Sequence, residues 1–302
     1  MKTINIYGKE IPVREFGCKG MHLDKVYSYG NIVNLFIQVD SRCNADCPFC
    51  IYHNCNTKTF NVKKLEEIVK YLSSNFDIGK LNFTGGEPTI DFNKFNEVVY
   101  CTKENINWER KPEVTLNTNG LHLLETLVHE DYFDVLGLSR HHYDDEINKK
   151  IFNCDNYATA EIIKEFQNKV NNKQLMQLRC NAIKGYIDNP KEIECYLNHA
   201  IDLGVYDCGF VTLFYANDYC KEHQIDFYNM LSGINNIIKV NGFERFENGR
   251  QVCECGNYVY TNSCGQFCKF YNRYFCNSNL TEGQLVYDGE NLRLGFGGPV
   301  VY

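Results

Sequence analysis

The chain has 302 residues and a formal net charge of −7, enough length for one large domain or two ordinary ones. Its acidic balance, without a long basic run, gives no indication of a nucleic-acid partner or of a membrane surface. The N-terminus lacks the continuous apolar stretch of a signal peptide, and no run approaches eighteen apolar residues, so we expect a cytoplasmic protein.

Apolar runs rich in β-branched residues alternate along the chain with segments of helical periodicity, which indicates a parallel α/β sheet with right-handed crossovers. The predicted strands are 31–40, 80–85, 113–119, 133–139, 174–185 and 206–214. The predicted helices are 62–75, 92–104, 156–170, 190–204 and about 222–239, with a weaker one at 121–131. We therefore divide the chain into a β-rich N-terminal segment (1–30), the region of alternating strands and helices (31–240) and a Cys-rich C-terminal extension (241–302).

Polar residues occupy every second position of several predicted strands, so they share one face of each strand. Strands of a parallel sheet that is covered on both faces should be apolar throughout. A solvated face would explain this pattern, but a helix follows nearly every strand. We therefore infer a curved sheet with the helices outside and a polar interior that binds a ligand. The polar residues are Asn34, Gln38, Asp40, Asn82, Thr84, Thr115, Asn117, Asn119, Gln177, Arg179 and Asn181.

Sixteen cysteines without a secretion signal indicate metal or redox chemistry rather than a disulfide framework. Cys43, Cys47 and Cys50 have the spacing C-x₃-C-x₂-C directly after the first strand, at the edge where α/β sheets bind ligands. Three thiolates on a [4Fe–4S] cluster would leave one iron open, whereas zinc, with His53 and Cys55 nearby, is the alternative. The isolated cysteines, which we expect to be small buried residues, are Cys18, Cys101, Cys154, Cys180, Cys195, Cys208 and Cys220.

Two further motifs end the next two strands. The sequence "TGGEP" (84–88) follows the second strand, and "NTNG" (117–120) ends the third. Two adjacent glycines let the backbone approach a ligand closely, and successive N–H and C=O groups suit a zwitterionic amino-acid moiety. Because the carboxyl ends of parallel strands share one edge, these motifs belong to the same site as the cysteine loop.

In combination, "CNADCPFC" (43–50), "GGEP" (85–88) and "NTNG" (117–120) resemble the motifs of the radical S-adenosylmethionine (SAM) superfamily. Ser139 at the end of the fourth strand fits the same pattern. So does Phe49, since the family commonly has an aromatic residue before the third cysteine, against the adenine. The resemblance covers roughly residues 31–214.

This resemblance implies a partial (β/α)₆ barrel, a [4Fe–4S] cluster on the three cysteines of the loop, and SAM chelating the unique iron. Gly85, Gly86 and Glu87 would then lie at the amino group of the methionine moiety. The candidates for ribose or carboxylate contacts are Asn119, Ser139, Arg179 and Asn181.

The family's reaction begins when the reduced cluster donates an electron to SAM, which breaks into methionine and a 5′-deoxyadenosyl radical that abstracts hydrogen from a substrate. The cofactor carries the difficult chemistry, so the lack of a Ser-His-Asp pattern is no objection. A cellular reductant such as flavodoxin or ferredoxin is an implied partner.

The segment "GLSRHHYDDE" (137–146) follows the fourth strand at the same edge of the sheet. We take His141 as the candidate catalytic residue and Arg140, His142 and Tyr143 as candidate substrate contacts. An arginine with two histidines suits a phosphate, a carboxylate or a heterocycle.

Five cysteines lie within twenty-four residues near the C-terminus, with the spacing C-x-C-x₈-C-x₃-C-x₇-C. The spacing only loosely resembles the SPASM and Twitch extensions that hold auxiliary clusters in some members of the superfamily. We take Cys253, Cys255, Cys264 and Cys268 as candidate ligands of a second [4Fe–4S] cluster. A β-rich cap with buried thiols, or one closed by zinc, is the alternative.

Three functions are consistent with these patterns. The first is a radical SAM enzyme that acts on a small molecule such as a nucleotide, sugar or amino acid, favoured because no N-terminal region suited to peptide recognition precedes the barrel. The second is a maturase that modifies a ribosomally made peptide or protein, and the third is a non-catalytic iron–sulfur or zinc protein. The sequence leaves open the substrate, the bond formed, the reuse of SAM and the oligomeric state.

Overall fold

The computed structural model describes residues 2–13, 32–50, 59–227, 233, 243–245, 258–263, 265–271 and 284–302. The strands β3 to β8 are neighbours in the order of the sequence, and every adjacent pair is parallel. This confirms the predicted partial (β/α)₆ barrel. The strands are β3 (Ile32–Asp40), β4 (Asp77–Gly85), β5 (Glu113–Thr118), β6 (Val135–Ser139), β7 (Met176–Ala182) and β8 (Asp207–Thr212).

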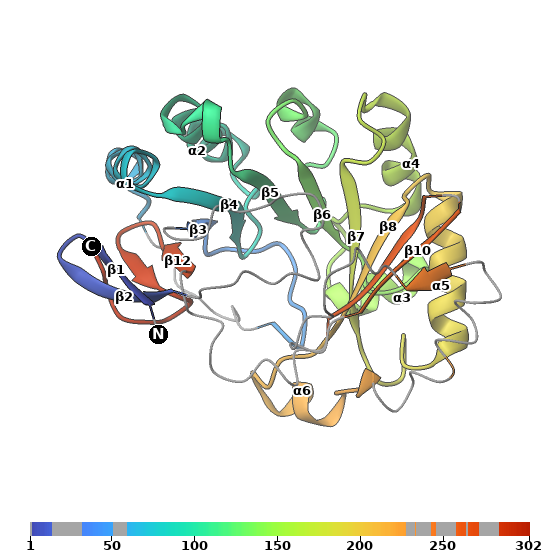
Figure 1. Cartoon of the computed structure of the whole chain (residues 1–302). Helices are drawn as coiled ribbons and strands as arrows, with labels where there is room; N and C mark the ends of the chain where they lie inside the picture. The colour runs from blue at the N-terminus through green and yellow to red at the C-terminus, as the bar shows by residue number, and fades with distance from the viewer. Residues whose placement is uncertain are drawn as a thin grey trace.

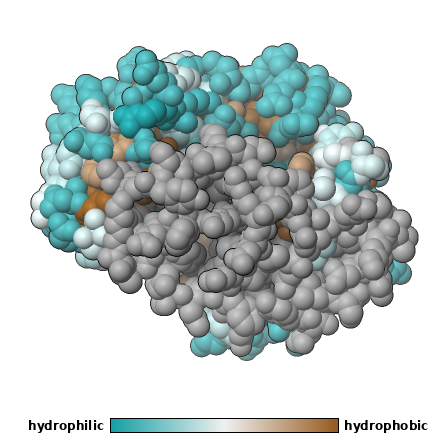
Figure 2. All heavy atoms as spheres, viewed as in Figure 1, coloured by the Kyte–Doolittle hydropathy of each residue, from teal (hydrophilic) through white to brown (hydrophobic). Residues whose placement is uncertain are grey.

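The sheet curves, and helices α1, α2, α4 and α5 surround its outer side (Figure 1). The surface over α1 and α2 is mainly hydrophilic, as expected for helices that turn one apolar stripe to the core (Figure 2). The α-helices are α1 (Val62–Asn75), α2 (Phe92–Asn105), α3 (Asp145–Phe152), α4 (Ala160–Lys169), α5 (Pro190–Asp202) and α6 (Asp218–Glu222). The 3₁₀ helices are η1 (Trp108–Arg110) and η2 (Glu125–His129).

Side-chain caps fix where the helices begin, and this sets the length of each strand–helix loop. The Asn61 side chain accepts a hydrogen bond from the Lys64 N–H at the start of α1, and Asp91 does the same for Lys94 in α2. Each cap satisfies a backbone donor that the first helical turn leaves without a partner.

The alternation of the strands sorts their residues onto two faces. In β3, the side chains of Val33, Leu35 and Ile37 are fully buried against the helices, whereas the intervening residues are partly exposed. Burial of each such side chain contributes about 1.5–3 kcal/mol, so the register of β3 is strongly fixed. The polar residues therefore lie on the concave face, which confirms the predicted polar interior.

The C-terminal segment joins the same sheet at both of its edges. Strand β11 pairs in parallel with β8, and β12 pairs in parallel with β3. Antiparallel partners extend each edge in the sheet order β13-β12-β3 to β8-β11-β10-β9. The strands are β9 (Phe243–Arg245), β10 (Tyr258–Asn262), β11 (Phe267–Tyr271), β12 (Gln284–Tyr287) and β13 (Leu292–Leu294).

The N-terminal segment forms a hairpin of β1 (Lys2–Ile6) and β2 (Lys9–Val13). The Tyr7 ring stacks on Tyr71 of α1 and on Tyr302, with ring centroids 4.1 Å apart in both pairs. The hairpin thus lies beside α1 and the C-terminal residues (Figure 1).

Two elements differ from the sequence predictions. The weak helix predicted at 121–131 is a series of turns with the short η2, in which the Thr126 hydroxyl donates to the Leu123 carbonyl. Helix α3 was not predicted because eight residues show too little periodicity. Most of the helix predicted at about 222–239 lies outside the described residues.

No helix in the described part of the chain combines the length and the apolar character that a membrane span requires.

Candidate functional site

The cysteine loop begins at Asp40, the last residue of β3. Asp40 accepts hydrogen bonds from the Arg42 backbone N–H at 2.9 Å and from its guanidinium Nη2 at 2.8 Å, and it also contacts the Lys94 ammonium. Burial alone would raise the pKa of the Asp40 carboxyl, but the hydrogen bonds from Arg42 and Lys94 outweigh it and hold this pKa well below its usual range. Asp40 is therefore an anionic anchor for the start of the loop.

The two glycines of "GGEP" bring the loop after β4 against the cysteine loop. The Gly86 N–H donates to the Asp40 carbonyl and the Glu87 N–H to the Arg42 carbonyl, both at 2.8 Å. A Cβ atom on Gly85 would lie 2.2 Å from the Asp40 carbonyl oxygen, and one on Gly86 would lie 2.3 Å from that of Arg42. Gly85 also has a φ of +145°, which side chains disfavour. The glycines are needed for this contact, whatever ligand the site binds.

Glu87 is almost fully buried, and its carboxylate connects the loops after β4 and β5. It accepts hydrogen bonds from the Thr89 hydroxyl at 2.6 Å, the Thr118 hydroxyl at 2.7 Å and the Asn119 N–H at 2.8 Å. Burial raises the pKa of the Glu87 carboxyl, and these hydrogen bonds oppose that rise. Oε1 accepts from both the N–H and the hydroxyl of Thr89 and from Thr118, and Oε2 accepts from Asn119, so the carboxylate fixes the two loops against each other.

Asn119, the asparagine of "NTNG" predicted to bind SAM, lies beside the first cysteine. Its Nδ2 is 3.8 Å from the Cys43 sulfur and 2.8 Å from the Asn44 carboxamide oxygen. The motifs of three consecutive strands therefore meet at one point, as the strand order predicted.

The outer side of the cysteine loop is held by α3 and by the segment before α6. The Asp46 N–H donates to the carbonyl of Phe152, the last residue of α3, at 2.9 Å. The Asn217 carboxamide donates to the Pro48 carbonyl at 2.9 Å, and the Cys220 thiol lies 3.6 Å from the Phe49 carbonyl. The loop is thus held by protein groups on both of its sides.

The three thiols of the loop lie close enough to influence one another. Burial raises the pKa of the Cys43 thiol to about 11, and neighbouring Glu87 and Cys50 add to the rise. Burial, with Cys50 and Cys43, also raises the pKa of Cys47 well above its usual range. Thiolates are stable at these buried positions only when a metal compensates their charge, so the raised pKa values suit thiols that lose their protons when a metal binds.

Within the described ranges, no three His, Cys, Asp or Glu side chains are close enough to hold a metal ion. Three cysteines on one loop suit a [4Fe–4S] cluster that keeps one iron open, whereas a closed structural zinc site needs a fourth protein ligand.

His141 lies directly against Phe49. The two rings meet edge to face with centroids 5.1 Å apart, and Phe152 packs on the other side of the imidazole at 5.0 Å. The Asn181 N–H donates to His141 Nδ1 at 3.1 Å, which places the ring proton on Nε2. Burial lowers the pKa of His141 to about 3. His141 is therefore a neutral ring that supports Phe49, with one N–H to donate.

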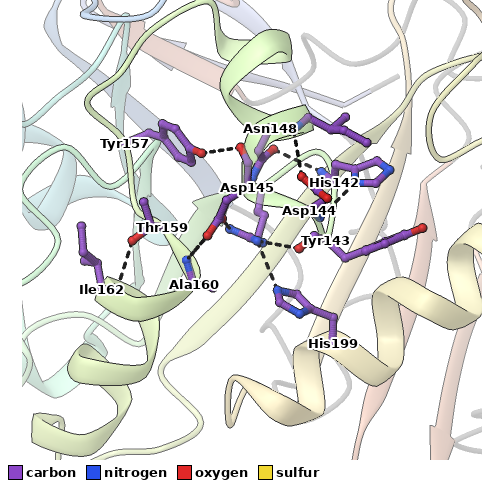
Figure 3. Close-up of polar contacts among 12 residues, drawn as sticks. His142, Tyr143, Asp144, Asp145, Asn148, Tyr157, Thr159, Ala160, Ile162 and His199 are labelled. Carbon is purple, nitrogen blue, oxygen red and sulfur yellow. Dashed lines mark hydrogen bonds and ion pairs between the residues drawn. The ribbon is translucent and has the colours of Figure 1, made fainter.

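Arg140, just after β6, belongs to a polar network whose other members on α3, α4 and α5 include Asp145, Ala160 and His199, labelled in Figure 3. Its guanidinium lies 2.8 Å from the Asp145 carboxylate, donates to the Tyr143 carbonyl at 2.9 Å and is 3.2 Å from His199. Asp145 in turn accepts from the Ala160 N–H at the start of α4, at 3.1 Å. The candidate substrate contact at Arg140 remains a prediction. Nη2 makes the contacts with Tyr143 and His199, and Nε has no hydrogen-bond partner among the described residues.

The neighbouring candidates are oriented by local hydrogen bonds. His142 Nδ1 accepts from the Asp144 N–H at 3.0 Å, and burial lowers the pKa of His142. The Tyr143 hydroxyl donates to Glu192 at 2.9 Å. The hydrogen bond to Glu192, with burial, raises the pKa of Tyr143 to about 12. Both residues keep their predicted place just beyond β6.

The remaining candidates on the concave face come from β6 and β7. Ser139 ends β6 and pairs in register with Arg179 of β7, and Asn181 follows two residues later. The Arg179 guanidinium contacts Asn117 and donates to Gln177 at 2.9 Å. Arg179 therefore lies close to, but not within, the group of side chains around Cys43.

The candidate ligands of a second cluster are mostly outside the described residues, since only Cys268 is described. Cys268 is fully buried in β11, in register with Cys208 of β8, and belongs to the hydrophobic core. Burial raises the pKa of its thiol well above the usual value. A metal role for Cys268 remains a prediction.

One residue near the loop was not recognised in the sequence as a neighbour of its cysteines. Cys154, expected to be one of the small buried cysteines, is partly exposed and contributes to the raised pKa values of Cys43 and Cys47. Its sulfur lies 3.9 Å from the Asn44 carboxamide nitrogen. No sequence pattern could have found this, because α3 and its C-terminal turn bring Cys154 to the loop from more than a hundred residues away.

Residues 37–193, more than half of the chain, match the family model of the radical SAM superfamily, and the chain belongs to this superfamily. The protein is therefore an enzyme of the radical SAM type, and membership implies SAM and a [4Fe–4S] cluster as its cofactors.

Two proteins with similar sequences have names that indicate different kinds of substrate. The chain is 32% identical over 99 residues to a putative peptide biosynthesis protein, YydG, of Bacillus subtilis, which is 32% of this chain and 30% of that protein. It is 27% identical over 214 residues to a probable GTP 3′,8-cyclase of Methanocaldococcus jannaschii. This match covers 69% of this chain and 66% of that protein. The substrate class therefore does not follow from these similarities.

Among solved structures, SuiB of Streptococcus suis bound to SAM has a TM-score of 0.57 at 17% identity, over 70% of this chain and 49% of that chain. This similarity confirms the fold alone. The chain spans about half of SuiB and less than a third of YydG, so the activity and partners of the whole protein are matters for proposal.

Proposed function

We propose that the protein cleaves SAM reductively at a [4Fe–4S] cluster on Cys43, Cys47 and Cys50, and that the resulting radical abstracts hydrogen from a small molecule. A nucleotide, a sugar or an amino acid is the class of substrate. The observation that carries the proposal is the set of backbone hydrogen bonds that holds the cysteine loop against "GGEP" beside Asn119.

When bound, the cluster and SAM supply the electron transfer and the 5′-deoxyadenosyl radical. The protein supplies a loop that is fixed on both sides, so little ordering is needed when a cluster binds. The three cysteines must lose their protons on binding, so cluster uptake is favoured by rising pH.

The surrounding residues would bind SAM. The "GGE" residues Gly85, Gly86 and Glu87, which lie against the cysteine loop, would meet the methionine amino group. Phe49, supported by His141, offers an aromatic face to adenine. Asn119, Ser139 and Asn181 provide polar groups at the same edge of the sheet for the ribose and carboxylate.

A peptide or protein substrate is the second candidate. The similarity to the peptide biosynthesis protein YydG supports it, whereas the similarity to a GTP 3′,8-cyclase supports a nucleotide. The polar side chains along the concave face support the small molecule, since they offer hydrogen bonds to a ligand bound within the barrel.

The test compares wild-type protein with Cys47→Ala after anaerobic reconstitution. We expect about four irons and sulfides per wild-type chain. We also expect 5′-deoxyadenosine when dithionite and SAM are added, and neither iron nor cleavage in Cys47→Ala. Cys195→Ser, a partly exposed thiol on α5, is the matched control and should behave as wild type.

Other outcomes have distinct meanings. A soluble Cys47→Ala variant with full turnover would exclude the cluster assignment, and zinc without iron or cleavage would support a non-catalytic protein. About eight irons in wild type, falling to about four in Cys47→Ala, would place a second cluster on the C-terminal cysteines. Stimulation of cleavage by nucleotides, sugar phosphates or amino acids, but not by peptides, would favour the first class of substrate.

A further inference from the structure

Arg179 is a cation without a carboxylate partner on the concave face of the sheet. Its neighbours in β7, Leu178 and Cys180, are fully buried in the core, so Arg179 projects from the opposite face. No carboxylate in the described part of the chain lies within ion-pair distance of its guanidinium.

The nearby charges on this face are already neutralised in pairs. Lys80 and Glu113 lie 2.9 Å apart, and Lys269 and Asp207 lie 2.5 Å apart. Arg179 adds one positive charge to these two balanced pairs. A partly buried guanidinium without a counterion is costly, so the arrangement favours an anion there.

Two carboxamides hold the guanidinium in a fixed direction. Arg179 Nε donates to the Gln177 oxygen at 2.9 Å, and Nη1 contacts the Asn117 oxygen. The Gln177 carboxamide nitrogen donates to Asp207 at 2.9 Å, so its oxygen must face the arginine. Neither contact involves Nη2, and both acceptors are uncharged, so they neutralise none of the charge.

The sheet makes room for the guanidinium below the edge where the cysteine loop lies. Arg179 pairs in register with Ser139, but its guanidinium reaches back over Gly137, which pairs with Asn117 and Gln177. A Cβ on Gly137 would lie 2.5 Å from Arg179 Cζ. The guanidinium therefore lies over Gly137, two residues before Ser139 on β6. Ser139 and Asn119 lie at the carboxyl-terminal edge of the sheet, which we call the rim, and the guanidinium lies below it.

We propose that Arg179 binds an anionic group of the substrate, a carboxylate or a phosphate, on the concave face below the rim, rather than SAM itself. The planar guanidinium suits either group, because it donates parallel hydrogen bonds to two oxygens. This inference rests on the proposed function only in placing the substrate on this face. It narrows the substrate to a molecule that carries an acidic group.

The experiment measures anion binding by reconstituted holoenzyme through thermal unfolding, followed by circular dichroism, at constant ionic strength. The probes are inorganic phosphate, pyrophosphate and succinate, titrated against sodium chloride. We expect at least one of them to raise the midpoint of wild type, and its affinity to fall at least tenfold in Arg179→Gln. Phosphates alone, or succinate alone, would identify the acidic group.

Two further variants keep the result interpretable. Arg110→Gln removes a half-exposed arginine that pairs with Asp77 before β5, and it should bind anions as wild type does. Arg179→Lys keeps the positive charge but loses the planar guanidinium that donates two parallel hydrogen bonds, so it should bind the anion more tightly than Arg179→Gln but less tightly than wild type. It also replaces Arg179→Gln in the comparison if that variant does not fold.

The proposal is wrong if no probe stabilises wild type more than chloride, or if Arg179→Gln and wild type bind the probes equally well. It is also wrong if Arg179→Gln weakens the binding of SAM and leaves the anions unaffected, since Arg179 would then be a SAM contact. Anion binding without production of 5′-deoxyadenosine by wild type would instead contradict the proposed function and leave this inference standing.

Discussion

Asp40 shows how much one residue contributes to the site beyond any recognised motif. It holds Arg42 and Lys94 through its carboxylate and Gly86 through its carbonyl oxygen, so it joins the cysteine loop to the loop after β4. In the sequence it is only the last polar residue of a strand.

Asp40→Asn should destabilise the fold by about 2 kcal/mol, the usual loss for a buried hydrogen bond to a charged group. The folded-state pKa of Asp40 lies below its unfolded value of about 3.9, so its contribution is complete above that pH. The contribution is lost as the pH falls below that value toward the folded-state pKa. Urea unfolding at pH 7 and below pH 4 measures both effects.

The variant should therefore show a weaker loss of stability below pH 4 than wild type. Asp131→Asn, in an exposed pair with Lys103, is the control and should change stability by less than about 0.5 kcal/mol. Identical acid profiles for wild type and Asp40→Asn would show that the carboxylate is not held as described.

At the scale of elements, the ion pair between buried Arg140 and partly exposed Asp145 positions α3 and α4 against the sheet. Arg140 is 1% exposed, and Asp145 lies at the start of α3 while accepting from the first turn of α4 (Figure 3). Because Phe152 at the end of α3 holds Asp46, this pair indirectly supports the cysteine loop.

Asp145→Ala should lower the free energy of unfolding by about 3 kcal/mol, since it leaves a buried guanidinium without its counterion. Asp155→Asn removes the exposed partner of Lys149 and should have little effect. Urea unfolding of the two variants, side by side, gives the comparison. Equal stabilities would mean that the pair of Arg140 and Asp145 is no more important for stability than a surface pair.

The helices around the sheet could be predicted only in part from the sequence. The long α1 and α2 have clear periodicity and capping residues, and their predicted bounds agree closely with the structure. Helix α3 is short, and its position depends on the contact between Arg140 and Asp145, which no local pattern reveals.

At the scale of the whole molecule, the C-terminal strands protect both edges of the parallel sheet. Strand β12 covers β3, whose last residue begins the cysteine loop, and β13 covers β12. An exposed β3 would present unpaired N–H and C=O groups to solvent and to other chains.

A chain that ends at residue 283 should therefore fail to remain soluble and folded. It would lose the buried side chains of Leu285, Val286, Tyr287 and Leu292, worth together about 6–12 kcal/mol as an upper estimate. This is comparable to the whole stability of a typical domain, about 5–15 kcal/mol. The solubility and the circular dichroism spectrum of the shortened chain, measured beside those of the full chain, test this prediction. A soluble, folded product would show that these strands are dispensable.

The sequence by itself determined the barrel, the family and the loop that we propose to bind the cluster. Periodicity is a local property, and the spacing of Cys43, Cys47 and Cys50 lies within a single loop. The order of strands and motifs along the chain then placed "GGEP" and "NTNG" at the same edge of the sheet, because neighbouring parallel strands end together.

Only the tertiary structure decided what each polar side chain contacts. The carboxylate of Glu87 is occupied by three neighbours, Arg179 turns away from the rim toward Gly137, and Cys154 approaches the cysteine loop from α3. Each contact joins residues that are distant in the sequence or depends on a side-chain direction. Such contacts are fixed by the packing of the whole sheet, because local patterns determine which face a residue occupies but not which partner it meets.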